Sequence, residues 1–388
     1  MVVPGIHRFL MMERVVYGQP AATALKAEVD RLERARAFIV TNRSLVKSDL
    51  LAGFASALGD RYAGCFSGVT AHGPRQCVVE GAAAARAAGA DLLVAVGGGS
   101  VIDAAKVMQL CLRHEIRAAA DLTAYTGRGR GEPSTRPADA DRWIRIIAVP
   151  TTLSAAEFTW FGGASDPERG VKEAFSNPMM MPQVVIMDSR MTTETPMHLL
   201  LTTGMKAVDH ATERLASLKS NPYNDAVSAL ALRELFSGLK AVHRDPSSLE
   251  ARAQVQYGAF MSMCGSAAGV PVGVGHAIGH ALGAHCGVPH GETSCTLLPS
   301  VMRWNLPSNP ERQVLIAVAL GGKDGDAAQA LAELVTGLGL PARLQDVGVR
   351  RDAFPAIAEK AMGDILIASN PRPVTTPRDI EKILEMAW

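Results

Sequence analysis

Four histidines lie close together between residues 275 and 292, and their spacing indicates chemistry. His276 and His280 are four residues apart, so on a helix their side chains lie on one face. His290 follows a turn containing Gly287 and Pro289 that could bring it back toward them. Imidazole binds divalent metals and also transfers protons near neutral pH. The segment predicts a metal or catalytic cluster, and the alternative is a set of histidines that are satisfied inside a core.

A second polar group occurs upstream in an apolar segment. Lys206, Asp209 and His210 stand at positions i, i+3 and i+4, which is the spacing of one helix face. Charged side chains inside an apolar segment need partners. We expect His210 to join His276 and His290 in one cluster.

A glycine-rich turn in the first half predicts a phosphate site. Glycine has no Cβ, so a phosphate can approach the backbone closely. The first N–H groups and the dipole of the helix that follows favour the same anion. Asp103 stands three residues after Ser100, which fits a capping box. The alternative is a tight strand-to-helix turn. The pattern predicts that a nicotinamide dinucleotide is bound by Gly97, Gly98, Gly99, Ser100 and Asp103.

The turn is not the common G-x-G-x-x-G fingerprint, and its strand is not the first one, so a variant of the doubly wound fold is expected. The first strand, Ala37–Val40, leads into Thr41, Asn42 and Arg43. An acidic residue near such a strand end would select NAD. Asn42 and Arg43 stand there instead, and Arg43 could bind a 2′-phosphate or be an exposed loop residue. The cofactor prediction is therefore NAD or NADP, with Asn42 beside it.

The elements that must position these motifs change type along the chain. The first half alternates strands with helices, which predicts parallel pairing and right-handed crossovers. After about Asp188 the β-branched runs end and helical periodicity continues to the C-terminus. We predict an α/β N-terminal dinucleotide-binding domain over residues 1–190 and an all-α catalytic domain over 191–388. The expected strands are Ala37–Val40, Gly64–Val69, Leu92–Val96, Ile144–Val149 and Val184–Ile186, and the expected helices are Ser48–Leu58, Gln76–Ala88, Val101–Leu112, Pro222–Leu239, Leu249–Gly269 and Ala327–Leu338.

Composition excludes several classes of function. The 388 residues are 48% hydrophobic and 20% charged, and 39 basic side chains nearly balance 38 acidic ones. This composition is typical of a soluble globular protein and lacks the basic block of a nucleic-acid or membrane binder. No apolar stretch is long enough to cross a bilayer, and His7 and Arg8 interrupt any signal-peptide core. The six cysteines form no C-x-x-C pair, so we expect free thiols and a cytoplasmic protein. The Gly-, Pro- and Arg-rich stretch Gly127–Asp141 predicts an exposed loop.

These motifs, taken in order, resemble the iron-containing (group III) alcohol dehydrogenases over nearly the whole chain. The run from Gly97 to Lys106 resembles the family's pyrophosphate loop, and Val149-Pro150-Thr151-Thr152 resembles its nicotinamide-side loop. Lys172 matches a lysine that contacts the cofactor ribose. The His276-to-His280 and Pro289-His290-Gly291 segments match its histidine motifs. The resemblance implies a dehydroquinate synthase-like fold with its active site in the cleft between two domains. It also implies cofactor contacts from Thr151, Thr152, Leu153 and Lys172.

The resemblance also raises the question of a metal. Metal-dependent members hold one divalent iron or zinc with an aspartate and three histidines. His210, His276 and His290 fall on the histidine positions, but Lys206 occupies the aspartate position. A protonated ammonium cannot ligate and repels a dication. Either Asp209 supplies the missing ligand, or Lys206 replaces the metal by polarising the substrate oxygen. We expect the second arrangement and no bound metal.

The segment from Pro150 to Thr159, together with Glu292, resembles the maleylacetate reductases, a metal-free branch that reduces a keto-diacid from aromatic ring cleavage with NADH or NADPH. The resemblance implies an NAD(P)-dependent oxidoreductase for a small, carboxylate-bearing substrate of aromatic compound catabolism, acting as a homodimer. Lys206, His210, His276 and His290 would surround the reacting oxygen, and His280 would relay a proton or bind substrate.

The alternatives for the function of this chain are an iron- or zinc-dependent alcohol dehydrogenase, a dehydroquinate synthase-like lyase and a non-catalytic nucleotide-binding protein.

Overall fold

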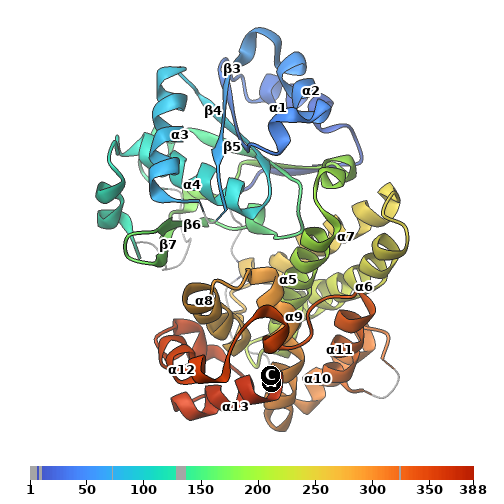
Figure 1. Ribbon diagram of the computed structural model, residues 1–388. Helices are drawn as coiled ribbons and strands as arrows, with labels where there is room; N and C mark the ends of the chain where they lie inside the picture. The colour runs from blue at the N-terminus through green and yellow to red at the C-terminus, as the bar shows by residue number, and fades with distance from the viewer. Residues whose placement is uncertain (1–6, 8–10, 72, 128–136, 323–324) are drawn as a thin grey trace. The chain divides into compact units, whose positions relative to one another are not determined.

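The computed structural model describes residues 7, 11–71, 73–127, 137–322 and 325–388 (Figure 1). The chain divides into two compact units, the first ending at Thr195 and the second beginning at Pro196. The first unit is α/β and the described part of the second contains only helices and loops, which confirms the predicted fold class. His7 groups with the helical unit, where its ring centroid lies 4.5 Å from that of Tyr223.

The α/β unit contains a six-stranded sheet whose strand pairs are all parallel. The spatial order is β1-β8-β5-β4-β2-β3. Five of the strands were predicted from the sequence to within two residues, and the short edge strand β1 was not. The strands are β1 Arg14–Tyr17, β2 Ala37–Asn42, β3 Tyr62–Val69, β4 Leu92–Gly97, β5 Arg145–Pro150 and β8 Val184–Met187.

Helices cover both faces of this sheet, which explains why its central strands are apolar throughout. Successive side chains of a strand point to opposite faces. On β4, Leu92, Val94 and Val96 pack with residues of α1 (Ala21–Arg31) and α2 (Asp49–Leu58). Leu93 and Ala95 pack on the other face with α3 (Arg75–Ala87) and α4 (Gly99–Arg113). A parallel sheet buried on both faces needs such continuous apolar strands.

The strand order creates a switch point at the carboxyl ends of β2 and β4. These two strands are neighbours in the sheet. The strand that follows β2 in the sequence, β3, lies on one side of the pair, and the strand that follows β4, β5, lies on the other side. In open α/β sheets, ligands bind in the crevice at such a point. Asn42 ends β2 and Gly97 ends β4, so the topology brings two of the predicted cofactor segments to one edge of the sheet.

A two-stranded antiparallel hairpin, β6 (Phe161–Asp166) and β7 (Val171–Ser176), was not predicted from the sequence. Its strands are short, and β6 contains two glycines rather than β-branched residues, so it lacks a strand signal. The hairpin carries Lys172, which pairs with Ser165 across the two strands.

The helical unit is organised around α5, whose residues from Leu200 onward are almost all buried. Helix α9 begins against it, because a Cβ on Gly291 would lie 2.7 Å from the backbone of Thr202. The three helices predicted in this region are confirmed. The helices are α5 Met197–Ala216, α6 Pro222–Arg244, α7 Leu249–Ala267, α8 Val274–Cys286, α9 His290–Asn305, α10 Pro310–Ala319, α11 Ala327–Gly337, α12 Phe354–Met362 and α13 Pro377–Ala387.

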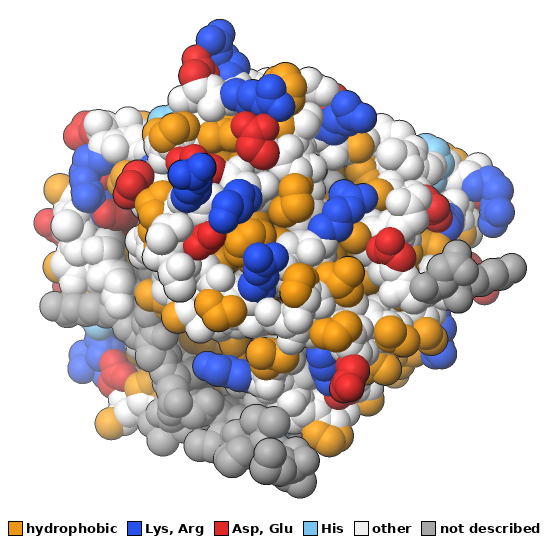
Figure 2. All heavy atoms as spheres, turned by 90° about the horizontal axis from the view of Figure 1, so that it is seen from below, with side chains coloured by type: hydrophobic (Ala, Val, Ile, Leu, Met, Phe, Trp, Pro, Cys, Tyr) orange, Lys and Arg blue, Asp and Glu red, His pale blue; other side chains and the backbone are white. Residues whose placement is uncertain are grey.

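Surface features of the described chain agree with the balanced composition. Figure 2 shows a face on which basic, acidic and hydrophobic side chains are mixed. Among the described helices, none is both long and apolar enough to cross a membrane. The six cysteines are free thiols, as predicted. Most of the predicted loop Gly127–Asp141 lies outside the described residues, since residues 128–136 are not described.

Candidate active site

The glycine turn has the geometry of an anion site. Helix α4 begins at Gly99, with Gly98 as its N-cap residue. The N–H of Val101 donates to the carbonyl of Gly98 at 2.9 Å, so the N–H groups of Gly98, Gly99 and Ser100 precede the first hydrogen bond of the helix. These groups stand at the positive end of a helix of 15 residues. The turn therefore fits the pyrophosphate of a dinucleotide.

The capping box predicted for Ser100 and Asp103 is wrong. The helix starts two residues earlier than expected, so Ser100 lies inside its first turn and no side chain caps it. Asp103 is instead 3.4 Å from the ammonium of Lys172, measured from Oδ2 to Nζ. This ion pair joins α4 to the hairpin and places two predicted cofactor residues beside each other.

The predicted nicotinamide-side loop lies against the glycine turn. The N–H of Thr151 donates to the carbonyl of Gly97 at 3.1 Å. A Cβ on Gly98 would lie 2.8 Å from Cγ2 of Thr152, so the close approach of turn and loop requires glycine there. Leu153 is fully buried and contributes to packing. Pairing of β4 with β5 therefore brings these two motifs, about 50 residues apart, into contact.

The end of β2 carries no acidic group. The Asn42 side-chain oxygen accepts hydrogen bonds from Ser44 Oγ at 2.8 Å and from the N–H of Leu45 at 3.1 Å. This oxygen is therefore used to hold the turn, while Arg43 beside it is exposed. Asn42 lies at the predicted place, and its role in cofactor binding stays a prediction.

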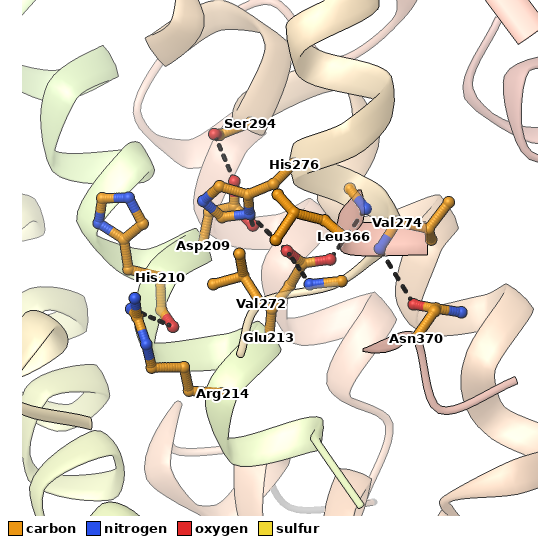
Figure 3. Close-up of polar contacts among 12 residues, drawn as sticks. Asp209, His210, Glu213, Arg214, Val272, Val274, His276, Ser294, Leu366 and Asn370 are labelled. Carbon is orange, nitrogen blue, oxygen red and sulfur yellow. Dashed lines mark hydrogen bonds and ion pairs between the residues drawn. The ribbon is translucent and has the colours of Figure 1, made fainter. Parts of the chain in front are cut away.

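The helical unit contains a buried polar cluster, which we call the α5–α8 cluster, and Figure 3 labels its members other than Lys206. Its members are Lys206, Asp209, His210 and Glu213 of α5, His276 of α8 and Ser294 of α9. Lys206 Nζ donates to Asp209 Oδ2 at 3.1 Å, and Ser294 Oγ donates to the same oxygen at 2.7 Å. The side chains of Lys206 and Asp209 are 14% and 4% exposed. The predicted helix face of Lys206, Asp209 and His210 thus lies inside the protein.

Glu213 fixes the orientation of His276. Its carboxylate accepts hydrogen bonds from the N–H groups of Gly273 at 3.0 Å and Gly275 at 2.9 Å, and it also contacts His276 Nδ1. An ionised carboxylate can only accept, so His276 Nδ1 carries the hydrogen and donates it. The remaining nitrogen, His276 Nε2, is buried and has no protein partner among the described residues.

Two other polar atoms of the cluster are also buried without a described partner, namely Asp209 Oδ1 and His210 Nδ1. The rings of His210 and His276 are stacked, with centroids 5.1 Å apart and planes at 25°. Buried polar atoms are almost always hydrogen-bonded in folded proteins. Three exceptions within one cluster indicate a place where a polar ligand completes the hydrogen bonding.

Burial and neighbouring charges set the protonation of the cluster. Burial, reinforced by the neighbouring ammonium of Lys206, holds the pKa of His210 well below its usual value. Burial also lowers the pKa of His276, although Asp209 and Glu213 oppose that effect. Burial alone would raise the pKa of Asp209, but the charge of Lys206 and the hydrogen bonds from Ser294 and Lys206 bring it below its ordinary value. The histidines are thus neutral at neutral pH and Asp209 is ionised.

The charges of the cluster balance. Arg214 is buried beside it and donates to the carbonyls of His210 and Ser262, and burial lowers its pKa to about 10, so it stays charged. Lys206 and Arg214 therefore offset Asp209 and Glu213. Glu213, which the sequence interpretation did not consider, is one of the two anions in this balance.

His280 and His290 form a separate pair near the cluster. Their ring centroids are 5.7 Å apart with the planes nearly perpendicular. His280 Nδ1 lies 2.7 Å from Asp364 Oδ2, and about half of the His280 side chain is exposed. A carboxylate at this distance orients the ring and leaves Nε2 of His280 as the nitrogen available to a substrate or to water.

The residues at the metal-ligand positions that the resemblance implies do not all belong to one group of possible ligands. Among the described residues, the group whose possible ligand atoms all lie within 4.8 Å of one another is Asp209, Glu213 and His276. His210 and His290 do not belong to it. Glu213 is already held by two backbone N–H groups, and the ammonium of Lys206 sits on Asp209. An ammonium at this place repels a dication, so these donors do not fit a divalent metal site.

The sequence contained a signal for Glu213 that was not used. It stands four residues after Asp209 on the same apolar helix, which is the same spacing that identified His210. Ser294 and Asp364 had no such signal. They reach the site from 85 and 84 residues away along the chain.

Comparison with known proteins gives the same class as the fold and the turn. The model of iron-containing alcohol dehydrogenases matches residues 13–189, and the C-terminal model of the same family matches residues 200–388. A lactaldehyde reductase of Escherichia coli is 32% identical, covering 98% of this chain and 100% of that protein. Maleylacetate reductase 1 of Cupriavidus pinatubonensis is 29% identical over 93% of this chain and 91% of its own. The crystal structure of maleylacetate reductase from Agrobacterium tumefaciens superimposes with a TM-score of 0.82 at 28% identity, covering 99% of this chain and 98% of that one.

A parallel sheet with a dinucleotide turn at its switch point, in a chain whose relatives are reductases, defines an NAD(P)-dependent oxidoreductase. The chain belongs to the iron-containing alcohol dehydrogenase family, and its likeness to maleylacetate reductases supports the branch that the sequence resembled.

Proposed function

We propose that the protein reduces a small keto acid with NADH or NADPH, by hydride addition to its carbonyl or to a C=C bond conjugated with that carbonyl, and that Lys206 acts in place of the family's metal ion. The observation that carries this proposal is the position of Lys206. It stands four residues before His210, where the metal-dependent members have an aspartate, and its ammonium is buried against Asp209. A fixed ammonium polarises a carbonyl oxygen and stabilises the negative charge that develops on it.

The cofactor would be held by the N–H groups of Gly98, Gly99 and Ser100, with Thr151, Thr152 and the pair of Asp103 and Lys172 beside it. The bound nicotinamide supplies or accepts the hydride. Lys206 has three N–H donors and one of them is used by Asp209, so two remain for a substrate oxygen. His280, oriented by Asp364 and half exposed, would carry a proton between that oxygen and water.

The proposed substrate class is a keto acid such as maleylacetate or a related product of ring cleavage. Several maleylacetate reductases are about 30% identical to this chain, which supports the assignment. Because the buried charges of the α5–α8 cluster balance, the cluster itself would bind the carbonyl. A substrate carboxylate would be bound by groups outside it.

The test combines metal analysis with turnover. We expect the purified protein to contain well below one equivalent of iron or zinc. It should oxidise NADH or NADPH with maleylacetate at a rate that a chelator does not change. Lys206→Asp, which restores the family's ligand type, should bind zinc or iron and lose the metal-free activity. Tight stoichiometric metal in the wild type would instead support a metal-dependent alcohol dehydrogenase. Turnover without net loss of reduced nicotinamide would support a lyase.

A further inference from the structure

Lys106 is a fully buried lysine in the middle of α4. Its ammonium donates to the carbonyl of Ala156 at 2.6 Å, to Oγ1 of Thr159 at 2.8 Å and to the carbonyl of Phe161 at 3.0 Å. A lysine ammonium has three donors, so all of them are used on this one segment. Although Lys106 belongs to the motif that begins with the glycine turn, it has no donor left for a phosphate.

The segment that Lys106 binds, residues 154–162, has an unusual backbone. Ala155 has a φ of 58°, which is uncommon for a residue other than glycine, and its side chain is buried. Thr159 Oγ1 donates to the carbonyl of Ala156 at 2.8 Å, and the carbonyl of Phe161 lies 3.1 Å from the same hydroxyl. Because the hydroxyl has one hydrogen, Lys106 Nζ is the donor that all three oxygens share. The shape of the segment therefore depends on the ammonium.

Both ends of this segment pack against the first turns of α4. It follows directly on Thr151, Thr152 and Leu153, the proposed nicotinamide-side loop. A Cβ on Gly99 would lie 3.0 Å from Ser154 Oγ, and a Cβ on Gly162 would lie 3.0 Å from the carbonyl of Asp103. Lys106 attaches the middle of the segment to the same helix. The glycine turn and the loop are thus parts of one packed structure.

Buried charge accompanies Lys106. Burial lowers the pKa of Lys106 to about 8, against the charges of Asp103 and Glu157. Burial likewise raises the pKa of Glu157 to about 7, and Oε2 of this fully buried side chain has no hydrogen-bond partner among the described residues. Lys172 pairs with Asp103 from the hairpin side. These are the charged groups that face Lys106 from the elements packed around it.

We propose that Lys106 is a positioning residue for cofactor binding, and that its ammonium holds residues 151–161 against α4 in the form that receives the nicotinamide half of NAD(P). This inference rests on the proposed function only for the assignment of that loop to the cofactor. It predicts that loss of the ammonium weakens cofactor binding without any change to a residue that touches the cofactor.

The test is Lys106→Met, which keeps an apolar chain of similar length and removes the donors. The matched control is Gln109→Leu. Gln109 lies three residues further along the same helix, is equally buried, and donates to the carbonyls of Ile144 and Met179 at 2.5 and 2.9 Å. Dissociation constants for NADH and NADPH are measured by nucleotide fluorescence, and the opening of residues 151–161 by hydrogen exchange. We expect Lys106→Met to raise the dissociation constant about tenfold or more and to speed exchange in that segment. Gln109→Leu should unfold at a lower temperature and bind the nucleotide as the wild type does.

A pH profile separates positioning from general stability. In the wild type, cofactor binding should weaken above about pH 8, because Lys106 loses its proton there. In Lys106→Met this dependence should be absent. The inference is overturned if Lys106→Met binds like the wild type, or if Gln109→Leu weakens binding equally. Should Lys106→Met fail to fold, Thr159→Val, which removes one of the three acceptors, must weaken binding several-fold for the inference to hold. A wild type that binds neither nucleotide would overturn the proposed function instead.

Discussion

The two units of this protein build their sites in different ways. In the α/β unit, the polar groups offered to a ligand are the backbone N–H groups of Gly98, Gly99 and Ser100, which are adjacent in the sequence. In the helical unit they are side chains of α5, α8 and α9, which the fold gathers from distant parts of the chain. A backbone site depends on chain conformation, so substitutions act on it through the close packing at Gly98 and Gly99. A side-chain site can change its chemistry with one residue, as we propose for Lys206.

The units also differ in how they satisfy buried charge. In the α5–α8 cluster, Lys206 and the adjacent Arg214 balance two anions, and three polar atoms are left without a described hydrogen-bond partner. Around the glycine turn, the one fully buried ammonium, Lys106, has every donor satisfied by the protein. The first arrangement leaves hydrogen-bonding capacity for the proposed substrate, whereas the second holds the loop that we propose to receive the cofactor.

The largest effect expected from this contrast concerns Lys206. Lys206→Met should lower kcat by about 10²–10³-fold, the usual cost of removing one group that stabilises developing charge. Binding of NAD(P)H should be unchanged, because the glycine turn is in the other unit. Steady-state kinetics and nucleotide titration measure the two quantities. Lys240→Met is the control, since Lys240 is exposed on α6 and lies over the ring of Phe236. Full activity in Lys206→Met would show that the reacting oxygen is stabilised by another group.

Glu157 tests whether buried charge in the α/β unit affects stability. Its pKa is raised from 4.5 to about 7 by burial, so the folded state holds its proton more tightly than the unfolded state. Relative to Glu157→Gln, the wild type should be most stable below pH 4.5 and should lose stability as the pH rises to about 7. The loss should be on the order of 3 kcal/mol, measured by urea unfolding at several pH values. If the difference in the free energy of unfolding between the two proteins does not change with pH, the carboxylate is solvated in the folded state.

Gly98 tests the backbone site directly. Gly98→Ala puts a methyl group 2.8 Å from Cγ2 of Thr152, so the turn and the loop must move apart. We expect a rise in the dissociation constant for NAD(P)H of about 10–100-fold, equivalent to roughly 1–3 kcal/mol of overpacking. Gly53→Ala on α2 is the matched control, because a Cβ there meets nothing within 4 Å. Equal nucleotide binding by the two variants would show that the turn is not part of the cofactor site.

The smallest effect concerns the choice between NAD and NADP. Arg43 is exposed beside Asn42 at the end of β2. Arg43→Ala should weaken NADPH binding by about fivefold, as expected for an exposed contact with a phosphate, and leave NADH binding unchanged. Parallel titrations with both nucleotides measure this ratio. An equal effect on both nucleotides would mean that Arg43 contacts the pyrophosphate or stabilises the fold.

The sequence by itself determined the features that depend on neighbouring residues. Five sheet strands, the glycine turn and the family were readable because period, turn chemistry and motif spacing are local properties. The departure at Lys206 was visible for the same reason. The predicted capping box was wrong because Gly98, not Ser100, is the N-cap residue, and there the turn packs closely against Thr152 and Ser154.

Only the tertiary structure decided which distant groups meet. Glu213 orients His276 across 63 residues, Asp364 orients His280 across 84, and Lys106 binds a segment 50 to 55 residues away. Each pairing follows from how helices and strands pack, and no local pattern encodes it. The sequence therefore identified the groups able to do chemistry, while the fold determined their partners, their protonation and the balance of charge around Lys206.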